Sequence, residues 1–251
     1  MRMAALIVVV AGLLGLAPVA HAQGAAKPGV ASAPVKGVVE LFTSQGCSSC
    51  PEADALLGKL VKRDDVIAIS LSVDYWDYLG WKDTLAQGKF SERQKAYAKV
   101  LGDGMVYTPQ AVVNGLAHVN GSDAGQIERA LDKTSKSAGH VPVRIATSDG
   151  KLVVEIPDAP AGMAGKAATI WLAVISRSVE VLIQRGENRG KTVTYSNVVR
   201  ELIPLGTWSG KATTVQLERH SFMHKGVDGC AVLLQQGQAG PIVGSALMRQ
   251  L

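Results

Sequence analysis

Apolar residues in this chain follow two periods, and each period predicts one kind of element. Residues 38–42 and 66–73 are short apolar runs rich in β-branched side chains, which is typical of buried strands. Between them, apolar residues recur at spacings i, i+3, i+4, i+7 and i+8 over residues 53–61, which predicts one face of a helix. The same pattern predicts a second helix between residues 84 and 101.

A tight hairpin and a third helix complete the first half of the chain. Two apolar runs within residues 109–119 flank Asn114-Gly115, the dipeptide that most strongly signals a two-residue hairpin turn. Ser122 is expected to cap a helix that runs through Lys136. The predicted order is therefore β-α-β-α-β-β-α. It favours parallel strands with right-handed crossovers, to which the hairpin adds antiparallel strands.

From His140 onward the pattern changes to short β-rich runs separated by Gly, Pro and Asn. No helical pattern of comparable strength lies between these runs. Several short strands at this spacing predict a mostly antiparallel, β-sandwich-like domain. We therefore expect two domains, over residues 35–138 and 139–251, with the boundary near Ser135–His140.

The first 22 residues have the pattern of a secretory signal peptide. Arg2 precedes an apolar run over residues 4–16, and Ala20-His21-Ala22 supplies small residues at the cleavage point. The run is short for a bilayer-spanning helix, and no later stretch has the necessary length. We expect export to the periplasm or the medium, no stable membrane insertion after cleavage, and a flexible linker over residues 23–34.

Composition excludes some classes of function. The formal net charge of the 251-residue chain is +5, and removal of the predicted signal peptide takes away only Arg2. The remaining excess is spread along the sequence, whereas a nucleic-acid-binding protein concentrates basic residues in a patch. We therefore expect no nucleic-acid partner. No Ser-His-Asp triad, Gly-rich phosphate loop or paired-carboxylate site stands out either.

Three cysteines remain, and two of them form a CxxC pair, Cys47 and Cys50. The pair lies at the junction of the first predicted strand and helix, where the helix dipole and free N–H groups favour a thiolate. Pro51 fits the first turn of that helix. We expect Cys47 to be the exposed attacking thiol and Cys50 the shielded resolving thiol. Cys230 precedes an apolar run and is interpreted as a buried small hydrophobe.

Two further segments are candidates for substrate binding beside Cys47. Trp76 and Tyr78 follow the strand at residues 66–73, at the carboxyl edge of the sheet, where open α/β sheets bind ligands. Thr108 and Pro109 stand immediately before the predicted hairpin. Trp76 and Trp81 have a second interpretation, in which they pack the two domains together.

Four segments carry a resemblance to a known family: residues 38–57, residues 72–83 with Phe90 and 93–98, residues 107–115 and residues 195–208. Together they resemble a bacterial exported family, domain of unknown function 1223, whose members are described as thioredoxin-like. The order β-α-β-α-β-β-α is also that of the minimal thioredoxin-like core. The resemblance implies a thioredoxin-like domain over residues 35–138 and a β-rich domain after it. It names no substrate.

The thioredoxin-like superfamily also implies roles for individual residues. Cys47 corresponds to the nucleophile, Cys50 to the resolving thiol and Pro109 to a cis-proline, beside which the backbone of Thr108 would pair with an extended substrate segment. Many thioredoxins carry a buried carboxylate six residues before the first cysteine. This position is Leu41 here, and Glu40 is expected on the opposite face of the strand.

Three functions remain open from the sequence. The first is a cofactor-free thiol–disulfide oxidoreductase that exchanges disulfides with protein or small-molecule thiols and is restored by a redox partner. The second is Cu(I) or Zn²⁺ binding at the CxxC pair. The further ligands would come from His118, His220, His224 or Cys230. The third is a non-catalytic binding module in which the disulfide is a staple and the tip at residues 185–191 is presented to a partner.

Overall fold

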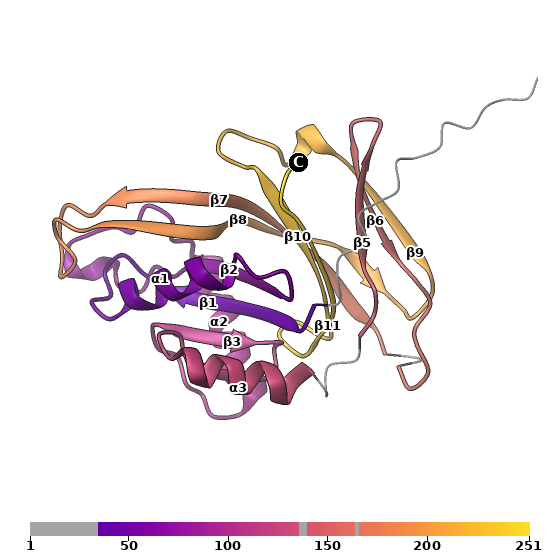
Figure 1. Ribbon diagram of the computed structural model, residues 1–251, viewed down its shortest axis with the longest axis horizontal. Helices are drawn as coiled ribbons and strands as arrows, with labels where there is room; N and C mark the ends of the chain where they lie inside the picture. Colours follow the sequence, from indigo (N-terminus) through magenta and orange to yellow (C-terminus); the bar gives the residue numbers. More distant parts are fainter. Residues whose placement is uncertain (1–34, 136–139, 164–165) are drawn as a thin grey trace, which may run out of the picture.

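The computed structural model describes residues 35–135, 140–163 and 166–251 (Figure 1). The predicted signal peptide and linker lie outside the described residues. None of the helices within the described residues is long and apolar enough to cross a membrane. The strands form two sheets, one of eight strands and one of three.

The first half has the predicted order of elements, with one short 3-10 helix added. Its elements are β1 (Gly37–Thr43), α1 (Cys50–Leu60), β2 (Val66–Ser72), η1 (Asp77–Leu79), α2 (Gly88–Leu101), β3 (Gln110–Val113), β4 (Ala117–Asn120) and α3 (Ala124–Ser135). Strand β1 pairs in parallel with β2 and antiparallel with β3, and β3 pairs antiparallel with β4. The predicted hairpin is confirmed, since Asn114 and Gly115 both have positive φ, at 53° and 64°.

The cap of α3 differs from the prediction. Asp123, not Ser122, accepts a hydrogen bond from the backbone N–H of Gln126, at 2.8 Å. The Gln126 side chain also donates to the other oxygen of the Asp123 carboxylate, at 2.7 Å, so Asp123 caps the helix. Ser122 instead donates its hydroxyl to Asn120 in the preceding turn. Lys136 lies outside the described residues.

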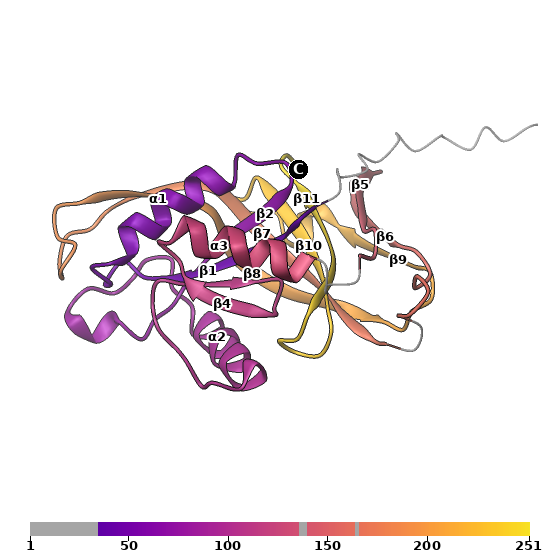
Figure 2. The same cartoon turned by 60° about the horizontal axis from the view of Figure 1, so that its bottom comes forward.

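The second half is antiparallel, as predicted. Its elements are β5 (Arg144–Ser148), β6 (Lys151–Ile156), β7 (Ala168–Leu182), β8 (Thr192–Trp208), β9 (Thr213–Glu218), the 3-10 helix η2 (Arg219–Ser221), β10 (Gly229–Gln235) and β11 (Ile242–Met248). Strands β7 and β8 form a long hairpin, and β10 pairs with both β7 and β11. In both views this hairpin runs alongside α1 (Figures 1 and 2).

The prediction of a separate sandwich is met only in part, because four strands of the second half extend the first sheet. The order of the large sheet is β11-β10-β7-β8-β2-β1-β3-β4. Strand β8 joins β2 in parallel at Ser70 and Val198, and the Asn197 side chain donates to the carbonyl of Ala68 at 2.9 Å. Every residue of β2 is buried, so its free edge needs a partner strand. Only β5, β6 and β9 form the second sheet, which packs on the large sheet through a shared apolar core.

Helices cover both faces of the part of the large sheet that β1 to β4 form. Alternate residues of β1 face different helices: Val39 and Leu41 pack with α1 and α3, whereas Val38 and Phe42 pack with α2. Helix α1 also packs on β2 and β8. The amino end of α1 therefore lies between the end of β1 and the β7–β8 hairpin, and this is where the CxxC pair is found.

Candidate active site

Cys47 and Cys50 form a disulfide at the start of α1, with their Cα atoms 5.4 Å apart. The backbone N–H of Cys47 donates to the carbonyl of Ser44, and that of Cys50 to the carbonyl of Cys47, each at 3.2 Å. Cys50 is the first residue of the helix and Pro51 stands in its first turn, as predicted. The strand-to-helix junction thus holds both sulfur atoms at the positive end of the helix dipole.

The prediction that Cys47 is exposed is wrong. Its exposed fraction is 1%, and Cys50 is fully buried. Asn188, in the tip between β7 and β8, bonds the loop that carries Cys47. Its side-chain nitrogen donates to the carbonyl of Cys47 at 2.8 Å and to that of Gln45 at 3.0 Å. Asn188 is itself buried, whereas its neighbours in the tip are exposed, so the tip at residues 185–191 is anchored on the cysteine loop.

Gln45, which the sequence analysis did not single out, connects the cysteine loop to the segment after β2. Its side-chain oxygen accepts a bond from Trp81 Nε1 at 2.8 Å, and its side-chain nitrogen donates to Thr84 at 3.0 Å. Trp81 packs against Ile183 and Tyr195 of the β7–β8 hairpin. The interpretation of Trp81 as a packing residue between the two halves therefore fits its position. No local pattern marks Gln45, because its partners are far away in the sequence.

Trp76 lies between the cysteine loop and the segment that contains Pro109. Its Nε1 donates to the hydroxyl of Thr108 at 2.8 Å, and a Cβ added at Gly46 would lie 3.0 Å from Trp76 Cβ. The Thr108–Pro109 peptide bond is cis. Tyr78, by contrast, is 79% exposed and points away from this packing.

Gly121 permits the close approach of Pro109 to α1. A Cβ added at Gly121 would lie 2.5 Å from Leu41, 3.2 Å from Pro109 and 3.4 Å from Ala53. The missing side chain thus lets the Pro109 segment reach the first turn of the cysteine helix. The structure brings Cys47, Cys50, Trp76, Thr108 and Pro109 into one region, and leaves Tyr78 at its surface.

The two carboxylates near the disulfide have opposite surroundings. Glu40 lies on the α2 face of β1, where it forms a buried ion pair with Arg93, with Nε and Oε1 2.7 Å apart. The hydroxyl of Tyr97 also donates to Glu40, and burial raises the pKa of Tyr97 well above its usual range. Because α1 lies on the other face of the sheet, Glu40 is committed to this network and not to the cysteines.

Asp54 is the second carboxylate, and it lies in α1 four residues after Cys50. It is 2% exposed, and neither of its oxygens has a hydrogen-bond partner within the described part of the chain. Burial raises its pKa to about 8; the nearby Thr43 hydroxyl opposes the rise and the charge of Asp83 adds to it. The sequence analysis missed this residue, although an acidic side chain between the apolar positions Ala53 and Leu57 was a visible signal.

Comparison with known proteins assigns the family. A family model described as "Protein of unknown function (DUF1223)" matches residues 38–235. The chain belongs to the DUF1223 family. A crystal structure of a protein from Agrobacterium tumefaciens is 37% identical to this chain, covers 86% of it and 95% of its own length, and superposes with a TM-score of 0.75. Among proteins with curated functions, none matches.

In this DUF1223 protein, the residues considered as metal ligands are dispersed. His118 contacts the Tyr107 hydroxyl at 2.9 Å and the Asp103 carboxylate. Cys230 lies in the core between the two sheets, and burial raises its thiol pKa to about 12. His220 and His224 are exposed. Within the described ranges, no group of three or more His, Cys, Asp or Glu side chains is placed to hold a metal ion.

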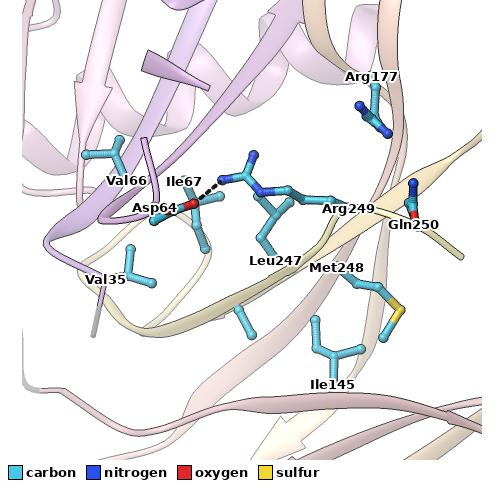
Figure 3. Close-up of a pocket in the computed structure, with 11 residues that line it drawn as sticks. Val35, Asp64, Val66, Ile67, Ile145, Arg177, Leu247, Met248, Arg249 and Gln250 are labelled. Atoms are coloured by element: carbon cyan, nitrogen blue, oxygen red, sulfur yellow. Dashed lines mark hydrogen bonds and ion pairs between the residues drawn. The ribbon is translucent and has the colours of Figure 1, made fainter. Parts of the chain in front are cut away.

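A pocket of about 680 Å³ lies at the far end of α1 from the disulfide (Figure 3). Its lining is mainly apolar and includes Val66 and Leu247. Arg249 reaches from the end of the chain to the carbonyls of Val61 and Arg63, at 2.7 and 2.9 Å, and so satisfies groups that the end of α1 leaves free. The pocket is thus a feature of the carboxyl end of the helix and not part of the disulfide site.

Proposed function

We propose that this DUF1223 protein is an exported thiol–disulfide oxidoreductase whose first half is thioredoxin-like. The observation that carries the proposal is the position of the disulfide. Cys47 and Cys50 are bonded at the amino end of α1, and a cis proline, Pro109, approaches the first turn of the same helix. The order of elements supports this assignment. Export rests on the pattern of residues 1–22.

The exchange reaction needs no cofactor, because sulfur supplies both the nucleophile and the leaving group. A substrate thiolate attacks Cys47 Sγ, the Cys47–Cys50 bond breaks, and Cys50 leaves as a thiolate that takes up a proton. A second substrate thiolate then attacks the substrate sulfur of the mixed disulfide and releases Cys47. The substrate is oxidised to a disulfide and the protein is reduced by two electrons; the reverse sequence reduces a disulfide. A separate redox partner restores the starting state.

Two contacts make the region suitable for an extended substrate. Thr108 precedes β3, and in this proposal its backbone pairs with an extended substrate segment. Trp76 holds the Thr108 side chain and lies against Gly46, and so fixes the two loops relative to each other. Access to Cys47 requires the tip that carries Asn188 to move away from the cysteine loop. In this proposal, the second half controls access to the disulfide.

The reduction potential of the pair tests the proposal. The protein is equilibrated in glutathione and dithiothreitol buffers, and modified thiols are counted by mass spectrometry. We expect a reversible two-electron couple between about −120 and −270 mV, the range of exchange catalysts. In addition, Cys50→Ser should accumulate mixed disulfides with substrates, and Cys47→Ser should not. A pair that resists reduction below about −300 mV contradicts the proposal.

A structural disulfide is the second candidate, and one observation favours it. Both cysteines are buried, and Asn188 is bonded to the loop that carries them. A structural disulfide of this kind has a low reduction potential, and its Cys50→Ser variant accumulates no mixed disulfides. The titration described above therefore separates the two functions.

A further inference from the structure

We propose that Asp54 is the proton-transfer residue for Cys50, taking the proton of the thiol when the disulfide forms and returning it when the disulfide opens. This inference deepens the proposed function and rests on it. The supporting observations are the position of Asp54 in α1, its burial and its lack of hydrogen-bond partners.

Asp54 lies beside Cys50 in α1. The two residues are four apart in one helix, so their Cβ atoms are roughly 5–6 Å from each other on the same face. Helical side chains tilt toward the amino end of the helix, which directs the Asp54 carboxyl group back toward Cys50. Both residues are buried in the described structure. A proton that leaves or reaches Cys50 therefore needs a protein group, because the sulfur has no contact with solvent.

The surroundings of Asp54 leave its carboxyl group unused. Three groups from other elements face it: the Thr43 hydroxyl at the end of β1, the Asp83 carboxylate before α2 and the Tyr195 hydroxyl of β8. None of the three is a cation. Asp83 is occupied by the backbone N–H groups of Gln45 and Leu85, each at 2.8 Å. A buried carboxylate without a counter-ion, with only hydroxyl groups and a second carboxylate beside it, is costly, so its presence calls for a functional reason.

Each direction of the reaction balances with one proton on Asp54. When the mixed disulfide is resolved, the ionised carboxylate takes the Cys50 proton, the thiolate attacks Cys47 Sγ, and the substrate leaves as a thiolate. When a substrate thiolate opens the disulfide, Cys50 leaves as a thiolate and receives the proton of the neutral carboxyl group. Burial raises the pKa of Asp54 to about 8, so its carboxyl group can both accept and donate a proton near neutral pH.

The experiment follows resolution by Cys50 separately from attack by Cys47. Reduced protein is mixed rapidly with 5,5′-dithiobis(2-nitrobenzoate), which releases one thionitrobenzoate when Cys47 attacks and a second when Cys50 resolves the mixed disulfide. Cys50→Ser identifies the first phase, because it lacks the second. For Asp54→Asn at pH 7 we expect an unchanged first phase and a second phase slowed by at least about tenfold. At higher pH the difference should narrow, since hydroxide then removes the thiol proton without Asp54.

Glu52→Gln is the matched control, because it makes the same chemical change at an exposed position of the same helix. It should leave both phases unchanged. Asp54→Glu keeps a carboxyl group in the same turn and should restore part of the second phase. The inference is overturned if Asp54→Asn resolves at the wild-type rate, or if both phases slow equally at every pH. A wild-type protein that releases no thionitrobenzoate overturns the proposed function instead.

Discussion

At the scale of the residue, two buried carboxylates, Glu40 in β1 and Asp54 in α1, have different surroundings. Glu40 has a bidentate partner in Arg93, whose guanidinium nitrogens lie 2.7 and 3.1 Å from its oxygens. Asp54 has none, and its charge faces that of Asp83. The first carboxylate belongs to a structural ion pair, and the second has no ion pair within the described residues.

The unpaired state of Asp54 predicts a pH-dependent stability. Burial raises its pKa from 3.8 to about 8, so the folded protein keeps a proton that the unfolded chain loses. The free energy of unfolding therefore falls as the pH rises from about 4 to about 8. Asp54→Asn removes this dependence and should be more stable than the wild type at pH 8, by about 1–3 kcal/mol. Urea unfolding of the wild type and of Asp54→Asn at pH 5 and pH 8 measures their free energies of unfolding.

The comparison between the two pH values is the control in that experiment. The advantage of Asp54→Asn should shrink at pH 5, where the wild-type carboxyl group is largely protonated when folded. An advantage that is equal at both pH values would indicate better packing of the amide and not the loss of a titrating group.

At the scale of the element, the β7–β8 hairpin has two functions in the described structure: it pairs within the large sheet, and its tip covers the disulfide. Ile183 and Tyr195 pack beneath the tip with Trp81, so the hairpin is supported close to its end. The tip is closed by backbone bonds between Ile183 and both Gly190 and Lys191. Because this scaffold is independent of Asn188, removal of that one side chain should loosen the cover without unfolding the hairpin.

Asn188→Ala should therefore make the disulfide easier to reduce. The substitution removes the donor that bonds the carbonyls of Cys47 and Gln45 and leaves both without this partner. We expect dithiothreitol to reduce the Cys47–Cys50 bond about tenfold faster, the factor that corresponds to about 1.4 kcal/mol of lost hydrogen bonding. Arg189→Ala, at the exposed neighbouring position, should react at the wild-type rate. Equal rates for all three proteins would show that the tip does not limit access.

The sequence predicts much of the local structure and little of this long-range cover. Residues 53–61 and Asn114-Gly115 carry their own periodic or turn signal, and the structure confirms both elements. The burial of Cys47 has no such signal, because the residue that causes it is 141 positions away. A single Asn in a Gly-rich turn has the same local pattern whether it is solvated or bonded to another loop. Asp54 differs, because the sequence shows an acidic residue among apolar helix positions but does not show what that residue contacts.

At the scale of the whole molecule, a buried polar network joins the two halves of the large sheet. Arg93 of α2 donates to Glu40 of β1 and to Gln235 of β10, and Gln235 in turn donates to the Tyr97 hydroxyl at 2.8 Å. The charges of Glu40 and Arg93 compensate each other in a region without solvent. The network therefore fixes α2 between strands from opposite ends of the sequence.

Glu40→Gln should destabilise the whole protein, because it leaves the Arg93 charge buried without a counter-ion. Loss of one partner of a buried pair typically costs about 3–5 kcal/mol. Urea unfolding should show one transition at a lower midpoint. Glu128→Gln is the control, since Glu128 pairs with Lys36 and Arg63 at the surface and its loss should cost about 1 kcal/mol or less. A cost for Glu40→Gln no larger than that of the control would refute a structural role for the buried pair.

The anchoring of Asn188 on the cysteine loop also bears on the order in which the protein is made. A ribosome must add 141 residues after Cys47 before the side chain that covers it exists. Domains generally fold from the amino end during synthesis, so the segment from β1 to α3 emerges first, with β2 still lacking β8 beside it. Until the β7–β8 hairpin is in place, the two thiols lack the contact that Asn188 makes with their loop. The disulfide can therefore form before the hairpin is in place. A reagent that meets the folded protein must instead pass the hairpin tip.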